Sequence, residues 1–203
     1  MGCLRLRSLQ LVGCPKITTE ALIDVLLTLP ELRYVGSDKT GEIFKHPRIL
    51  EAGTIFQVEN AELNVSSHQA EGMEEKETDR NYVEKLSSVF PNLRNVKLNI
   101  NKETDEYVEY LENLSGLQEL IIDYPGCLGL GFYRFLSSSG VKLTQLGLSL
   151  GEYKSQHMKL IAKECKKLKI FHLFFTNYTN NEEYTQTNYV LPCLEGINII
   201  WYH

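Results

Sequence analysis

The sequence predicts an α/β fold, a solenoid of about eight strand–helix repeats with a parallel sheet on its concave face. Three observations predict this fold. An apolar triplet of the form L-x-x-L-x-L begins at Leu93, Leu117, Leu143 and Leu168, at steps of 24, 26 and 25 residues. Apolar residues at helical spacing fill the intervals between triplets. A similar spacing continues toward both ends of the chain.

The four central triplets are expected to be strands whose apolar side chains form the core. Side chains alternate between the two faces of a strand, so the fourth and sixth positions point the same way, and the first enters the core from the preceding turn. Burying each leucine contributes about 1.5–3 kcal/mol. The expected core residues of these triplets are Leu93, Val96, Leu98, Leu117, Leu120, Ile122, Leu143, Leu146, Leu148, Leu168, Phe171 and Leu173.

Further copies of the triplet lie nearer the two ends, beginning at Leu6, Leu32, Val58 and Leu194. The copies at Leu32 and Val58 fit less well, and the first of them has Ser37 at a core position. The step from residue 58 to residue 93 is 35 residues, which leaves an insertion of about nine. Residues 66–79 are acidic and nearly free of aliphatic anchors, which predicts a flexible insertion.

The intervals predict helices with apolar stripes on one side. Three polar residues stand at expected helix starts: Thr18, Thr104 and Ser155. Residues 39–56 resist assignment, because Pro47 falls inside any helix that can be drawn there. The stripes are Leu22, Val25, Leu26 and Leu29; Val83, Leu86 and Phe90; Tyr107, Val108, Leu111 and Leu114; Phe132, Phe135 and Leu136; and Met158, Ile161, Ala162 and Cys165.

Residues 9–22 resemble the cysteine-containing leucine-rich repeat of F-box and leucine-rich-repeat proteins, through Leu9, Leu11, Cys14, Pro15 and the following Ile-Thr pair. The resemblance implies a leucine-rich-repeat horseshoe and one repeat domain over residues 1–203. It also implies recognition of a substrate for a cullin-based ubiquitin ligase, whose adaptor would be a partner only if an F-box lies upstream. The chain begins inside the first repeat and ends on the strand of the last one, so a fragment of a longer protein is expected.

Composition argues against several other classes of protein. A net charge of −5 disfavours a general nucleic-acid binder. No apolar run approaches the roughly 20 residues that span a bilayer, so no membrane partner is expected. The five cysteines form no C-x-x-C pair, which favours reduced cysteines in the cytoplasm or nucleus. No metalloprotease, phosphate-loop or nucleophile-elbow motif occurs, and the histidines are scattered. We therefore expect no catalytic site, no metal site and no cofactor.

The third, fifth and seventh positions of each repeat are expected to face outward on the concave sheet. Apolar residues rimmed by polar ones gather toward the C-terminal repeats, which favours a protein contact. Alternatively, a further repeat or a folded-over segment covers them. The candidate protein-binding residues are Tyr34, Glu62, Lys97, Glu119, Ile121, Ile170, His172, Phe174 and Ile200.

The expected function is a protein–protein recognition module, the substrate-binding repeat domain of an F-box-type ubiquitin-ligase receptor. The alternative is a stand-alone leucine-rich-repeat interaction scaffold with no link to ubiquitin. A third reading, an enzyme with scattered catalytic residues, has no motif in its favour. The lysines of residues 154–167 raise a separate question, because they fit a solvated outer helix face or a site for an acidic partner or RNA.

Overall fold

The computed structural model describes residues 3–64, 83–100, 105–124, 126–151, 155–175 and 190–201. They form a mixed α/β fold in which every strand pair is parallel and neighbouring strands follow sequence order. The two-stranded sheet consists of β1 (Ser8–Gln10) and β2 (Tyr34–Gly36). The six-stranded sheet consists of β3 (Asn60–Asn64), β4 (Asn95–Asn99), β5 (Glu119–Tyr124), β6 (Gln145–Leu150), β7 (Ile170–Phe175) and β8 (Gly196–Trp201).

The strands are paired in the register that the repeat spacing predicts. Each begins at the third position of its triplet, and equivalent positions lie side by side across the sheet. Leu120 of β5, for example, pairs with Val96 on one side and Leu146 on the other. Equivalent residues therefore form continuous rows, so a side chain's position in its repeat determines which face of the sheet it occupies.

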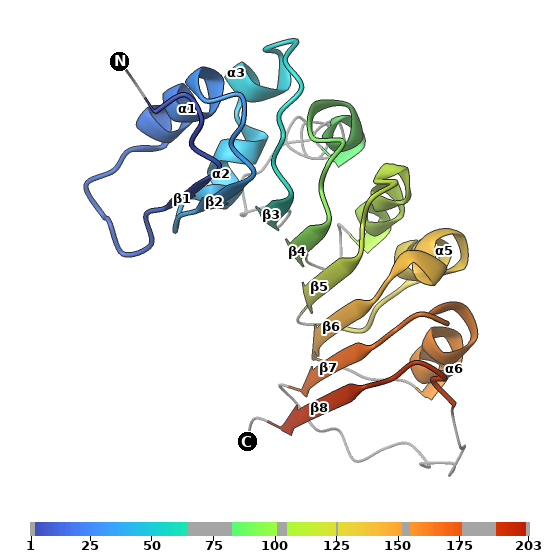
Figure 1. Cartoon of the computed structure of the whole chain (residues 1–203). Coiled ribbons are helices and arrows are strands. Elements are labelled where there is room, and N and C mark those ends of the chain that lie inside the picture. The colour runs from blue at the N-terminus through green and yellow to red at the C-terminus, as the bar shows by residue number, and fades with distance from the viewer. Residues whose placement is uncertain are drawn as a thin grey trace, which may run out of the picture.

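The helices lie along one side of the strands, and the strands follow one another along the inner side of a curved path (Figure 1). None of the described helices covers the opposite face, which we name the helix-free face; it carries the third, fifth and seventh positions of the repeats. The helical elements are α1 (Thr19–Thr28), α2 (Thr40–Lys45), α3 (Pro47–Leu50), residues 83–89, the 3-10 helix η1 (Asp105–Asn113), α5 (Leu130–Ser139), the 3-10 turn η2 (Gly140–Lys142) and α6 (Ser155–Glu164).

The core lies between the sheet and the helices. All twelve apolar residues of the four central triplets are at most 4% exposed, as predicted. The outermost repeats differ from the prediction. In β8, Ile197 and Ile199 hold core positions yet are each 49% exposed, and Leu9 of β1 is only partly buried. Strands β1 and β8 are the two ends of the described series of repeats, so no further described repeat packs against their outer sides.

The sheet divides between β2 and β3, the two repeats whose triplets fit the pattern least well. Ser37 occupies a core position of the β2 repeat, but β2 ends at the residue before it. The Thr40 hydroxyl donates to the carbonyl of Ser37 at 2.5 Å, and the amide of Ser37 donates back to the Thr40 Oγ1 at 3.1 Å. These local bonds end β2 at Gly36. One backbone hydrogen bond links the two repeats just before their strands begin: Glu59 N donates to Arg33 O at 2.8 Å.

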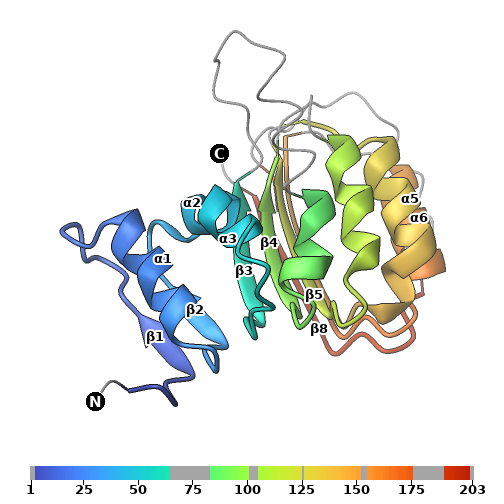
Figure 2. The ribbon, with the colours of Figure 1, turned by 90° about the horizontal axis from the view of Figure 1, so that it is seen from above.

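An aromatic cluster in the helix layer holds the repeats together on either side of this division. The Phe44 ring meets the Phe90 ring edge-on at 4.9 Å, and Phe56 stacks on Phe90 at 5.3 Å between centroids. Phe44 belongs to α2, while Phe90 follows the helical residues 83–89. Figure 2 shows β1 and β2 set apart from the six-stranded sheet, with α2 and α3 between the two groups of strands.

Several helix predictions were confirmed or corrected. Thr18 caps α1 by accepting a hydrogen bond from the amide of Ala21 at 3.2 Å, as expected. Ser155, the expected cap, is instead the first residue of α6. Pro47 does not exclude helix from residues 39–56, because it begins α3, where its missing amide is not needed. Thr104 and the acidic insertion of residues 66–79 lie outside the described residues.

Between the triplets that begin at Leu93 and Leu117, the sequence predicts an α-helix, but the structure has the 3-10 helix η1. Its repeat is the shortest, with 24 residues from Leu93 to Leu117. A 3-10 helix rises about 2.0 Å per residue, against about 1.5 Å in an α-helix, so fewer residues span the repeat. The predicted stripe is nevertheless correct, since Tyr107, Val108 and Leu111 are at most 3% exposed.

Candidate functional site

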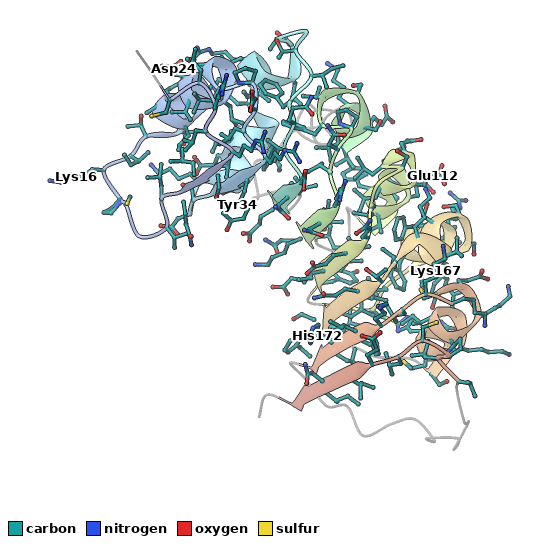
Figure 3. The ribbon with its side chains drawn as sticks, in the orientation of Figure 1. Lys16, Asp24, Tyr34, Glu112, Lys167 and His172 are labelled. Carbon is teal, nitrogen blue, oxygen red and sulfur yellow. The ribbon has the colours of Figure 1, made fainter. Side chains whose placement is uncertain are left out.

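Five of the nine predicted binding residues line one hollow on the helix-free face. The hollow has a volume of about 540 Å³ and crosses the division between the two sheets. Figure 3 shows Tyr34 on the strand side of the molecule and Glu112 on the helix side. The five residues come from four strands that are consecutive in sequence: Tyr34 from β2, Glu62 from β3, Lys97 from β4, and Glu119 and Ile121 from β5.

Polar contacts between neighbouring strands order the centre of the hollow. Lys97 Nζ lies 2.8 Å from Glu62 Oε1, which also accepts a hydrogen bond from Asn99 Nδ2 at 3.4 Å. The side-chain amide of Asn95 donates to the side-chain oxygen of Asn60. All three contacts join β3 to β4. The pairs Lys97–Glu62 and Asn95–Asn60 lie at equivalent positions of the paired strands, and Asn99 reaches Glu62 diagonally.

Two glycines create space for the large side chains at the hollow. A Cβ placed on Gly36 would lie 2.9 Å from the Tyr34 hydroxyl, so the tyrosine ring lies over this glycine. A Cβ on Gly147 would lie 3.1 Å from Cγ1 of Ile121, which leans from β5 across to β6. Any larger residue at either glycine would push these side chains out of position.

The hollow carries more acid than base. Its charged lining residues are Asp38, Glu62, Glu119 and Lys97, three acids and one base, for a net charge of −2. Asp38 Oδ2 accepts a hydrogen bond from the backbone amide of Gly13 at 2.9 Å, which fixes the carboxylate beside the first repeat. A second carboxylate of the lining, Glu62, forms an ion pair with Lys97. The hollow therefore offers carboxylates, one ammonium group, an aromatic ring and an aliphatic side chain.

Sequence reasoning missed part of this lining. Val12, Asp38, Asn60 and Asn95 also line the hollow, and all four hold outward positions in the repeat, so the signal was present. The core residues Val35, Ala61 and Val96 line it as well. No sequence signal marks them, since their access depends on the opening of the sheet at Ser37.

Three other predicted residues form a separate group on β7. Ile170 is 36% exposed, while the His172 and Phe174 rings stack at 6.3 Å with an interplanar angle of 16°. Asn198 Nδ2 lies 3.0 Å from His172 Nδ1 and joins β8 to the group. Phe174 is half-buried, with its ring stacked on that of His172.

The predicted surface is thus divided into two parts. Strand β6, with Gln145, Gly147 and Ser149 facing outward, lies between the hollow and the β7 group, and none of the β7 residues lines the hollow. The ninth predicted residue, Ile200, lies in β8, but its side chain is outside the described ones. A single partner would have to contact both parts to use all the predicted residues.

The described side chains include one Cys–His pair that sequence spacing did not reveal. Cys127 Sγ lies 3.7 Å from Nε2 of the buried His157, which is also 3.3 Å from the carbonyl oxygen of Leu128. Burial, together with the nearby Glu164 carboxylate, raises the pKa of the separate Cys165 thiol to about 12. Among the described residues, no three His, Cys, Asp or Glu side chains are grouped to hold a metal ion.

Comparison with protein-family models and with curated proteins gave no match. Within the described ranges, no helix has the length and apolar character needed to cross a bilayer.

Proposed function

We propose that this chain is a leucine-rich-repeat solenoid of horseshoe shape and that its helix-free face recognises another protein. Three features support the proposal. The repeat positions stay in register from strand to strand, the helices lie on one side, and the strands lie on the inner side of a curve (Figure 1). Repeat proteins with this construction bind partners on their extended concave surface.

The observation that carries the proposal is the hollow, where four consecutive strands each present an outward residue. An aromatic ring, an aliphatic side chain and charged groups gathered at one place are typical of a protein contact. Before a partner arrives, Lys97 is already paired with Glu62, and the Tyr34 ring already lies over Gly36. Such order reduces the entropy lost when a partner binds.

The first form of this role is the substrate-binding repeat domain of an F-box-type ubiquitin-ligase receptor. The repeat motif at Cys14 supports it. In the structure these residues make the turn before α1, with the amide of Ile17 donating to the carbonyl of Cys14 at 3.1 Å and Thr18 capping the helix. The second form, an interaction scaffold without a ubiquitin link, uses the same face.

A charge-reversal pair tests recognition by the helix-free face. Lys97→Glu places two carboxylates beside each other in the hollow, while Lys85→Glu makes the same charge change among the helical residues 83–89. Purified wild-type and variant chains are used to capture proteins from a cell extract at equal loading. The proposal predicts a stoichiometric partner that wild type and Lys85→Glu retain and Lys97→Glu loses. If Lys97→Glu retains every captured protein, the hollow is not the binding site.

The two forms of the role differ in what happens to the captured protein in cells. If the chain serves a ubiquitin ligase, depleting it should raise the steady-state level of the captured protein and lengthen its half-life. If the chain is a scaffold, both quantities should stay unchanged. A cycloheximide chase with and without the chain separates the two outcomes.

A further inference from the structure

A second concave feature lies on the opposite side of the molecule, between α5 and α6. It is a groove of about 280 Å³ with almost entirely apolar walls, which we name the α5–α6 groove. Tyr133 of α5 forms one wall. The other wall is one side of α6, because its residues follow the i, i+3, i+4, i+7 spacing of a helix face: Gln156, Lys159, Leu160 and Lys163.

This face of α6 is distinct from the face that holds the fold together. The buried side of the helix consists of His157, Ile161 and Ala162. Tyr133 is kept in place by the ring of His157, 5.8 Å away between centroids, and Leu160 is partly buried against the core. Tyr133 and Leu160 therefore give the groove a packed apolar base, and the exposed side chains of Gln156, Lys159 and Lys163 complete its lining.

Charge at the groove is opposite to that of the rest of the chain. Residues 155–168 contain four lysines and one glutamate, a net charge of 4 − 1 = +3, whereas the whole chain carries −5. Lys159 and Lys163 stand about one helical turn apart, one before and one after Leu160 in the sequence. Lys163 Nζ lies 2.7 Å from Glu164 Oε1, but the lysine side chain is 74% exposed, and such surface pairs contribute little stability. A partner carboxylate can therefore replace Glu164.

We propose that the α5–α6 groove is a second protein-binding site, which takes an apolar side chain from an acidic partner segment. The apolar side chain lies against Tyr133 and Leu160, and flanking carboxylates pair with Lys159 and Lys163. The groove is smaller than the about 300–1,000 Å³ of a ligand pocket, so it accommodates one or two side chains of a longer segment. This site is independent of the recognition proposed for the helix-free face.

The observations favour an acidic peptide over RNA. A single-stranded RNA site needs a basic track and a series of aromatic platforms on which successive bases stack. Here one half-buried tyrosine lines a short groove, and two lysines flank a leucine. The phosphate backbone of an RNA would leave the apolar wall of the groove without a partner.

The test uses a fluorescein-labelled peptide of twelve residues, in which one Phe is flanked by Glu and Asp, and measures fluorescence anisotropy with the whole chain. We expect a dissociation constant of about 1 mM or lower. Replacing Phe by Ser, or the acids by Gln and Asn, should weaken binding at least about tenfold, because each change removes one of the two contacts. No binding at about 1 mM would overturn the proposal.

Matched double variants locate the site. Lys159→Glu with Lys163→Glu should lower the affinity for the peptide by about tenfold or more, because attraction becomes repulsion. Lys16→Glu with Lys85→Glu makes the same total charge change at exposed positions elsewhere and should leave affinity within about twofold. Equal losses in the two double variants would mean non-specific attraction. Tighter binding of a twelve-nucleotide oligouridine than of the peptide would also overturn the proposal.

Discussion

Adjacent residues of β5 provide a quantitative test of the register. Leu120 is fully buried at the centre of the six-stranded sheet, whereas Ile121 is half-buried and lines the hollow. Leu120→Ala removes three carbon atoms. At about 0.8 kcal/mol per buried methylene this costs about 2.4 kcal/mol, and the cavity left behind raises the loss to about 3–4 kcal/mol. Ile121→Ala removes as many carbons but only about half of their burial, so we expect about 1 kcal/mol.

Urea unfolding followed by far-UV circular dichroism measures both changes, with the midpoint and slope compared between variants. Leu120→Asp extends the series, since an unpaired charge in the core should unfold the central repeats. Equal destabilisation by the two alanine variants, or a Leu120→Asp chain as stable as wild type, would show that the two faces of β5 are assigned incorrectly.

Three further predictions have defined outcomes. Phe174→Ala should lower the free energy of unfolding by about 1 kcal/mol, and the neighbouring core change Leu173→Ala should lower it by about 2–5 kcal/mol. Thermal unfolding measures both, and equal losses would place Phe174 in the core. Thr18→Ala should remove the α1 cap and about 1 kcal/mol of stability, and an unchanged melting temperature would contradict the cap. Burial raises the pKa of Cys165 from 9.0 to about 12, so this thiol should stay protonated at pH 8. It should therefore react with iodoacetamide more slowly than the exposed Cys193, as measured by peptide mass spectrometry. The reverse order would contradict the burial of Cys165.

The same pKa shift has a consequence for stability at high pH. The Cys165 thiol of the unfolded chain ionises near 9.0, while in the folded chain it ionises near 12. Between these values the unfolded chain releases a proton that the folded chain keeps. The contribution of this thiol to the free energy of unfolding should therefore fall as pH rises from about 9 to about 12, and Cys165→Ala should lessen that fall in urea titrations at successive pH values.

The strands could be predicted because the repeat places apolar residues at positions that a strand presents to one face. This signal is strong where all three positions are apolar, as at Leu120, and weak where one is polar, as at Ser37. The weak repeat signal at Ser37 coincides with a break in the sheet, because Ser37 forms local hydrogen bonds with Thr40 and the sheet divides there. Pro47 misled the helix prediction because only its position within the helix decides whether it is tolerated.

The candidate site was predicted as a set of outward positions and not as a shape. Alternation along each strand places Glu62 and Ile121 on the correct face without any knowledge of neighbours. The hollow arises from the opening of the sheet, and the separate β7 group from the stacking of His172 on Phe174, and neither is encoded in spacing. The Cys127–His157 approach was missed for the same reason, because the two residues lie 30 positions apart in neighbouring repeats.

Recognition through the helix-free face is tested most directly by site-specific photo-crosslinking in cell extract. The photoreactive aromatic amino acid p-benzoylphenylalanine replaces Tyr34 in the hollow and, in a second chain, replaces the exposed Glu112 on the helix side (Figure 3). The proposal predicts a discrete crosslinked protein from position 34 that is absent from position 112 and is lost when Lys97→Glu is added. Crosslinks of equal yield from both positions, or a product at position 34 that survives Lys97→Glu, would contradict it.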